Sequence, residues 1–347
     1  MHLRTILNRR YCALILSTSL TFTLWSLWTR WGWASPEPAQ VEPEPSHPTG
    51  GYQVSCDKFP VHLLSDIQIV LRLGSSQPAD QVDSHINYIA PCIDNLILIS
   101  DREENIRRFQ TYDIIANLPP AYQEHNKDLK AHAKVNDPDC HISSKEGWRL
   151  DRFKFLPMVE YVREQSPAAK WFVFIEADTY VVWDTLFRLL AQYDSGEPLY
   201  MGSPTPGRPL ETGEKTWFAY GGAGFVLSAA AVEKLVERRI GQDGNFTEPS
   251  ISERYAELVK EDCCGDSVLG YALANKGIEL SGLYPIFNPH QLHGIPFSSR
   301  YWCQPVMTLH KTLPSDVPAF SAFLEQNSER VSVIHRTMTI VDRLVVN

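Results

Sequence analysis

An apolar run that ends in two carboxylates, WFVFIEADTYVV at residues 171–182, constrains this chain more than any other stretch. Residues 171–175 predict a short buried strand, because they are rich in aromatic side chains and carry no charge. Glu176 and Asp178 follow at its carboxyl end, where burial is costly without a cation or hydrogen bonds. Oxygen ligands there suit Mn²⁺ or Mg²⁺, which in turn can hold a diphosphate. The alternative is a strand-to-helix turn, with Asp178 capping locally and Asp184 capping the next helix.

The N-terminus differs from the rest of the chain and predicts a membrane anchor. Basic residues precede an uncharged, mainly apolar run with several tryptophans at its exit. About 20 such residues span a bilayer, and basic residues before the span favour a cytoplasmic N-terminus. We therefore expect a cytoplasmic tail at 1–10 and a transmembrane signal-anchor at 11–33. A cleaved signal peptide with its site at residues 32–34 is the alternative, and both place the remainder in the secretory pathway.

Residues 34–55 predict a stem, because prolines alternate there with glutamates and no core can form. The composition of the whole chain, 44% apolar and 21% charged, is that of a globular protein. We expect residues 56–347 to form one domain. After residue 34 the chain holds 28 basic and 41 acidic residues, a net charge of −13. Such a domain is a poor binder of nucleic acid unless it uses a metal or a local basic patch.

Cysteine usage agrees with an oxidising compartment. Cys12 lies in the anchor, and six others remain: Cys56, Cys92, Cys140, Cys263, Cys264 and Cys303. An even number favours disulfides, and the sequence leaves their pairing open. A zinc site is the alternative, although no C-x-x-C spacing supports it. Asn245 begins a glycosylation sequon, as expected of a lumenal domain.

Strand-like and helix-like segments alternate along the domain, which predicts an α/β sheet with helical crossovers. A strand at 66–73 and a helix at 78–90 lead to a second strand at 95–100, which ends at Asp101. In open sheets of this kind, ligands lie outside the carboxyl ends of the strands. Asp101 and Asp178 both fall there. We expect residues 102–145 to be an irregular excursion.

A helix predicted at residues 146–163 carries Arg149, Arg152 and Lys154. These cations form either an ordinary solvated face or a group that neutralises a phosphate near the acidic strand end. Further on, the segment 217–228 places glycines between aromatic residues.

Within that segment, Trp217, Gly221 and Gly222 are candidates for contact with a sugar, the alternative being a tight turn. Ser228 is expected to cap the following helix. Asp266 precedes a helical stretch and is either its N-cap or a general base. His290 and His310 are either structural or metal ligands, and a histidine that ends a strand beside an acidic site favours the latter.

Taken together, these motifs resemble the Fringe and core-1 β1,3-galactosyltransferase family, glycosyltransferase family 31, and its fungal Fringe-like branch in particular. The resemblance covers roughly residues 60–312. It rests on five motifs in the family's order: WFVFIEADTYVV, PLYMGSP (198–204), YGGAGFVLS (220–228), EDCCGDSVLG (261–270) and PVMTLHK (305–311). Each motif alone is weak, and their joint order and spacing carry the assignment.

The resemblance implies a single GT-A domain, Rossmann-like with a mostly parallel sheet, behind a transmembrane helix. It implies a type II Golgi membrane protein with a lumenal catalytic domain. Whether this protein forms a homodimer is left open. The expected activity is an inverting β1,3-type transfer from a UDP-sugar to a glycan or glycoprotein acceptor, assisted by Mn²⁺ or another divalent cation.

By the resemblance, Asp178 matches the last Asp of the family's D-x-D motif and binds the metal, while Glu176 stands at its first position. Asp266 matches the catalytic base and Asp101 a nucleotide-side Asp. His310 matches a metal-binding His, with His290 as the alternative. Two other hypotheses stay open. The first is an inactive GT-A protein that binds carbohydrate or acts like a chaperone; it is motivated by the E-A-D sequence of residues 176–178, which stands in place of the family's D-x-D motif. The second is a metal-dependent phosphoester hydrolase.

Overall fold

The computed structural model describes residues 54–326, apart from residues 58, 125, 136, 138–141, 297 and 302. All of them belong to the unit of residues 52–347. The predicted tail, the predicted anchor, all but the last two residues of the predicted stem, and Cys140 lie outside the described residues. Among the residues that are described, no helix has both the length and the apolar character needed to cross a bilayer.

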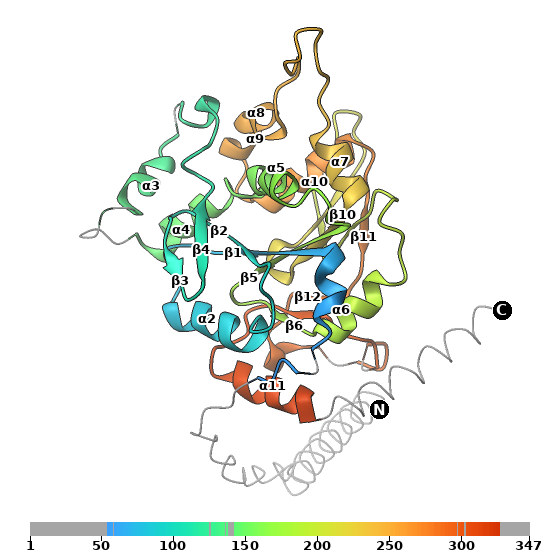
Figure 1. The fold of residues 1–347 in the computed structure, drawn as a ribbon. Helices are drawn as coiled ribbons and strands as arrows, with labels where there is room; N and C mark the ends of the chain where they lie inside the picture. Colours follow the sequence, from blue (N-terminus) through green and yellow to red (C-terminus); the bar gives the residue numbers. More distant parts are fainter. Residues whose placement is uncertain are drawn as a thin grey trace, which may run out of the picture. The chain divides into compact units, whose positions relative to one another are not determined.

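A large sheet forms the centre of the domain (Figure 1). Within the described residues it has eight strands, with four parallel neighbour pairs and three antiparallel ones. Their order across the sheet is β11 (Leu280–Gly282), β7 (Tyr200–Gly202), β10 (Phe225–Ser228), β5 (Trp171–Glu176), β1 (Ile67–Arg72), β2 (Ile97–Ser100), β4 (Phe109–Asp113) and β3 (Asn105–Ile106). The predicted mixed α/β fold with a mostly parallel sheet is therefore confirmed.

The central strand β5 is buried on both faces because its side chains alternate between two cores. Phe172 and Phe174 pack into one core, whereas Val173 and Ile175 pack into the other. β5 pairs in parallel with β1, so that Glu176 lies opposite Arg72 at the carboxyl end. The sequence run 171–175 predicts this strand because a doubly covered strand reads as continuously apolar.

Helices cover both faces of the sheet, and Figure 1 shows the two layers. One core lies under α5 (Phe155–Gln165), α7 (Ala229–Val236) and α10 (Gly265–Asn275), with α8 (Ile251–Arg254) and α9 (Ala256–Glu261) beside them. The other lies under α2 (Ala79–Ser84), its π-helical continuation His85–Ile89, α6 (Trp183–Leu190) and α11 (Asp316–Gln326). α3 (Leu129–Val135) and the short turn Pro120–Tyr122 pack against the first core.

Two small sheets complete the domain. One has the order β12 (Phe287–Asn288), β13 (Thr308–Leu309) and β6 (Tyr180–Val181), and the other pairs β8 (Pro204–Pro206) with β9 (Trp217–Ala219). The first of them joins the chain after β5 to the distant segment that ends in His310. This pairing brings two of the predicted metal ligands together.

Two sequence predictions need correction. Residues 102–145 are not simply an irregular excursion, because Phe109–Asp113 forms β4 and pairs in parallel with β2. The predicted helix at 146–163 is two helices, α4 (Ser144–Asp151) and α5, separated by residues 152–154. Pro157 explains the break, because its ring would clash with the carbonyl of residue 153 in a continuous helix.

The structure also shows which helix caps and cysteine pairs form. Ser228 caps α7 as predicted, its hydroxyl accepting a hydrogen bond from the Ala231 N–H at 3.1 Å. Asp184 does not cap α6, which begins after Val182. The disulfides are Cys56–Cys92 and Cys263–Cys264, and Cys303 is exposed and unpaired among the described residues.

Candidate active site

The turn after β5 holds the two carboxylates of the E-A-D motif in a fixed arrangement. The Glu176 N–H donates to the Thr179 hydroxyl at 3.1 Å, and this hydroxyl donates to the Gly222 carbonyl at 2.8 Å. Thr179 is fully buried, so both bonds are shielded from water. The turn is thereby tied to the glycine-rich segment, which the sequence places more than forty residues later.

His310 reaches this turn through the small sheet. Antiparallel pairing of β13 with β6 sets Leu309 opposite Tyr180, and the Thr312 N–H donates to the Asp178 carbonyl at 3.0 Å. As a result, His310 Nε2 lies 3.4 Å from Asp178 Oδ2. Ligand atoms of Glu176, Asp178 and His310 all lie within 4.8 Å of one another.

These side chains have the properties of a divalent-cation site. Burial, and then the charge of Glu176, raises the pKa of Asp178 to about 7, and its Oδ1 atom is buried without a hydrogen-bond partner among the described residues. Burial lowers the pKa of His310, which keeps its ring in the neutral form that coordinates metals. A cation would satisfy the orphaned oxygen and offset the cost of its charge. The donor set of carboxylate oxygens and imidazole nitrogen therefore fits Mn²⁺.

A glycine turn at Gly221–Ala223 contacts both His310 and Asp266. A Cβ atom on Gly222 would lie 2.4 Å from His310 Nε2, so the imidazole ring sits directly against this backbone. The Gly221 N–H donates to Asp266 Oδ2 at 2.8 Å, and a Cβ there would lie 2.8 Å from Phe155. Only glycine fits at both positions. The sequence left sugar contact and tight turn open for these glycines, and the geometry shows the close approach of side chains to a turn.

Asp266 is the second residue of α10, whose N-cap residue is Cys264 rather than Asp266. Its side chain is buried, and its Oδ1 also accepts from the Ser267 N–H at 2.9 Å. Burial raises the pKa of Asp266 despite the hydrogen bond from Gly221 and the nearby charge of Arg72. A carboxylate with a raised pKa is a stronger base than an exposed Asp.

Arg72 is a site residue that the sequence reasoning missed. Its buried guanidinium lies at the end of β1, where Nη2 donates to Glu176 Oε1, Nη1 faces Asp151 Oδ2, and the group stacks 4.1 Å above the Phe155 ring. The signal was an arginine directly after the apolar run of residues 69–71 in the predicted strand. Glu176 therefore has a cationic partner of its own, unlike Asp178.

The predicted nucleotide-side residues Asp101 and Lys154 lie together under the loop after β1. Lys154 is fully buried, donates to the Leu73 carbonyl at 2.5 Å and lies 3.4 Å from Asp101 Oδ2. Asp101 Oδ1 accepts from the Ser75 N–H at 2.8 Å. Burial opposes the charge of Asp101, but Lys154 and Ser75 together hold its pKa below the usual value. The Asp101–Lys154 pair holds the loop after β1 through buried contacts, and neither side chain is exposed.

His85 is a second residue that the sequence reasoning missed, and no local signal marks it. It is fully buried in the π-helical turn after α2, and its Nδ1 lies 3.3 Å from the Ala177 carbonyl. Burial lowers the pKa of His85 to about 4, so its ring is neutral and Nδ1–H donates to this carbonyl. The middle residue of the E-A-D turn is therefore anchored from the second core.

Other predicted residues lie outside the Glu176–Asp178–His310 group. His290 is exposed, with its ring 6.4 Å from that of Tyr284. Trp217 is exposed on β9, which packs against the Asp266 helix through Gly270. Arg149 lies 3.6 Å from Asp128. Asn245 is exposed in a turn, where its side chain donates to Asp243 at 2.9 Å.

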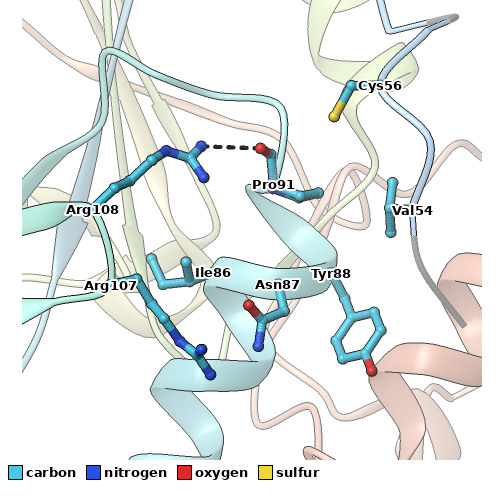
Figure 2. Close-up of a pocket in the computed structure, with 8 residues that line it drawn as sticks. All are labelled: Val54, Cys56, Ile86, Asn87, Tyr88, Pro91, Arg107 and Arg108. Carbon is cyan, nitrogen blue, oxygen red and sulfur yellow. Dashed lines mark hydrogen bonds between the residues drawn. The ribbon is translucent and has the colours of Figure 1, made fainter. Parts of the chain in front are cut away.

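Two surface hollows contain none of the Glu176, Asp178, His310 and Asp266 side chains. One, of about 480 Å³, lies beside the Cys56–Cys92 disulfide and is drawn in Figure 2, where Arg108 donates to the Pro91 carbonyl at 3.0 Å. The other, of about 440 Å³, includes Arg149.

Part of the chain is similar to known proteins. The Fringe-like family model matches residues 122–283. The β-1,3-N-acetylglucosaminyltransferase lunatic fringe of Mus musculus is 33% identical over 134 residues, which is 35% of this chain and 34% of that protein. Radical fringe of Gallus gallus is 32% identical over 144 residues, 38% of this chain and 36% of that protein. The chain thus spans about a third of the length of the curated relatives it matches.

A solved glycosyltransferase involved in the glycosylation of the major capsid of PBCV-1 aligns with a TM-score of 0.36 at 11% identity, over 73% of this chain and 98% of that one. This likeness is too distant to carry an argument. The family match includes β5, the E-A-D turn, the glycine turn and Asp266, and it ends before His310. Assignment to a fungal branch stays a prediction. Residues 122–283 of the chain therefore match the Fringe-like family, and part of the chain is similar to lunatic and radical fringe.

Proposed function

We propose that the chain is a glycosyltransferase that moves a sugar from a UDP-sugar to a glycan acceptor with inversion at the anomeric carbon. One observation carries the proposal: a single glycine turn contacts both the candidate metal ligand His310 and the candidate base Asp266. An inverting displacement needs these two functions on opposite sides of the reacting carbon. The fixed turn between them supports that division of roles.

Asp266 is the proposed base. Its Oδ2 takes the proton of the acceptor hydroxyl as the acceptor oxygen attacks the anomeric carbon and the bond to UDP breaks. The raised pKa of Asp266 favours this proton transfer, while the Gly221 N–H keeps the carboxylate oriented. A single base serves a single displacement, and no second carboxylate is required as a nucleophile.

Asp178 and His310 are the proposed ligands of a divalent cation, Mn²⁺ by the resemblance. When bound, the cation neutralises charge that develops on the departing diphosphate. Glu176 is tied to Arg72, and we assign it to orienting the turn rather than to direct coordination. His290 becomes the weaker candidate because it is exposed and outside the group.

The donor side is proposed to be the loop after β1, which Asp101 and Lys154 hold in place. Because Lys154 is fully buried, we assign it to fixing this loop instead of direct phosphate contact. The glycines contact protein side chains, which leaves the exposed Trp217 as the proposed sugar contact. A Golgi location, a type II anchor at 11–33 and glycosylation at Asn245 remain part of the proposal.

The alternative is a GT-A protein that binds carbohydrate without turnover. It is favoured only by the E-A-D variant, whose Glu176 is engaged by Arg72. The presence of both Asp266 and His310 beside one turn supports an enzyme instead.

A UDP-release assay tests the proposal on the full chain in detergent with Mn²⁺. UDP-N-acetylglucosamine is the first donor because the relatives are named N-acetylglucosaminyltransferases. UDP-galactose, UDP-glucose and UDP-N-acetylgalactosamine follow, each with and without a mixed glycan acceptor pool. Acceptor-stimulated release from one donor is the expected result. Mn²⁺-dependent UDP binding without release from any donor would favour the inactive protein.

A further inference from the structure

A basic pocket of about 440 Å³ lies beside the candidate active site. It is lined by four cations, one carboxylate and one amide: Lys127, Arg149, Arg152, Lys260, Asp128 and Asn126. The chain after residue 34 is strongly acidic, with a net charge of −13. The lining residues carry three excess positive charges, and the pairing of Lys260 with Glu257 at 2.6 Å leaves an excess of two. The pocket is therefore a local reversal of the domain's charge, and such a patch attracts anions.

Two of the cations form a rigid floor. The Arg152 side chain is 12% exposed, pairs with Asp128 at 2.6 Å and stacks 4.7 Å above the Phe153 ring. Its Nε atom is buried without a hydrogen-bond partner among the described residues. The Lys260 side chain is 13% exposed and donates to the carbonyl of Ala121 at 3.0 Å. Buried cations of this kind are costly unless paired.

The other two cations remain available to a ligand. Arg149 is 44% exposed and lies 3.6 Å from Asp128, beyond hydrogen-bond distance. Lys127 is exposed, and its side chain makes no ion pair within the described part of the chain. Asp128 already pairs with Arg152, so it does not neutralise the charges of Arg149 and Lys127 as well.

The pocket adjoins the turn that carries the proposed base. Arg152 Nη1 donates to the Asp262 carbonyl at 3.2 Å, and a Cβ on Gly265 would lie 2.3 Å from the Arg152 carbonyl oxygen. Arg152 thus contacts both ends of the segment that leads into Asp266. An acceptor must approach Asp266, and these contacts are the observation that links the pocket to the acceptor.

An exposed aromatic ring lies one helical turn away. Trp148 is 58% exposed on α4, four residues before Arg152, and residues four apart share a face of a helix. Tryptophan rings stack on the apolar faces of sugars, which suits a saccharide that also carries a charge.

We propose that the basic pocket binds an anionic group, a carboxylate, sulfate or phosphate, of a saccharide acceptor. The assignment of this saccharide as the acceptor rests on the proposed transferase function; the anion site itself does not. Lys127 and Arg149 hold the anion, Arg152 supplies the fixed charge beneath it, and Trp148 contacts the adjoining sugar.

The test is a binding titration with the full chain in detergent and without any sugar nucleotide, so that it does not depend on turnover. The probes are a glucuronic-acid-containing disaccharide, its glucose counterpart and inorganic sulfate. We expect the acidic disaccharide to bind more tightly than both others, and its affinity to fall with added salt. The double variant Lys127→Gln/Arg149→Gln should weaken it about tenfold. Trp148→Ala should weaken the disaccharide and leave sulfate unchanged.

Lys170→Gln serves as the matched control, because Lys170 is an exposed cation just before β5, at the opposite end of that strand from Glu176. Its affinity should equal that of the unmodified chain. Equal binding of the acidic and neutral disaccharides, or no loss in the double variant, would overturn the proposal. Sulfate as tight as the disaccharide would make the pocket a free-anion site. Displacement of the disaccharide by UDP with Mn²⁺ would assign the pocket to the donor instead.

Discussion

Replacement of Gly222 by alanine tests whether the glycine turn positions His310. The added Cβ would lie 2.4 Å from His310 Cε1 and Nε2 and 2.8 Å from its Cδ2. Ordinary carbon contacts start at about 3.5 Å, so the ring must move by roughly 1 Å. His310 is buried, with the Tyr220 ring 5.2 Å away, and has little space for this movement.

The cost has two measurable parts. Overpacking of a buried site lowers the free energy of unfolding by about 1–3 kcal/mol. Displacement of the imidazole from Asp178 should weaken Mn²⁺ by roughly 10- to 100-fold, as losses of ligand orientation do. Chemical denaturation without metal measures the first part, and Mn²⁺ titration followed by electron paramagnetic resonance measures the second.

A double-mutant cycle separates this contact from other effects. With His310→Ala present the clash disappears, so Gly222→Ala should then cost less than about 0.5 kcal/mol. Gly196→Ala is the control, because Gly196 is exposed and its nearest neighbour is the carboxylate tip of Asp194 at 3.2 Å. Unchanged stability and Mn²⁺ affinity in Gly222→Ala would refute the role given to this turn.

Three further variants test the charges around the E-A-D turn. Glu176→Gln leaves the buried Arg72 with only Asp151, so the free energy of unfolding should fall by about 2 kcal/mol while Mn²⁺ weakens less than tenfold. Asp178→Asn should instead abolish metal-dependent UDP binding without loss of stability, and equal Mn²⁺ losses in the two variants would contradict this division. Burial lowers the pKa of folded His85 to about 4, below the 6.5 of the unfolded chain. Its stabilising effect is therefore complete above pH 6.5 and disappears as the pH falls toward 4, about 3 kcal/mol in all. His85→Leu should flatten that part of the pH–stability curve in denaturant titrations, and an unchanged slope would show that another group titrates there.

Local patterns predicted β5, β1 and β2 because these strands are short, apolar and buried on both faces. The same patterns failed for β4, where exposed and buried residues alternate over only five positions within a polar segment. The sequence does contain a signal for the split between α4 and α5, because Pro157 is incompatible with a continuous helix. The helical spacing of the apolar residues continues across the break and favoured one helix instead.

The sequence predicted those site residues whose assignment follows from their residue type and from their position at the end of a strand. It did not predict those whose contacts depend on the packing of distant segments. Asp178 and His310 were expected to share a site, and the structure sets them 3.4 Å apart. The pairing of Arg72 with Glu176 depends on the register of two strands a hundred residues apart. His85 carries no local signal, because its role comes from one backbone carbonyl in another part of the fold.

The most direct test of the proposed mechanism compares the unmodified chain with Asp266→Asn. Acceptor-stimulated UDP release and Mn²⁺-dependent UDP affinity are measured on the same preparations. The proposal predicts unchanged UDP affinity and loss of transfer by at least about 100-fold, because a positioned base contributes roughly that much. Full transfer activity in Asp266→Asn would contradict the assignment of Asp266 as the base.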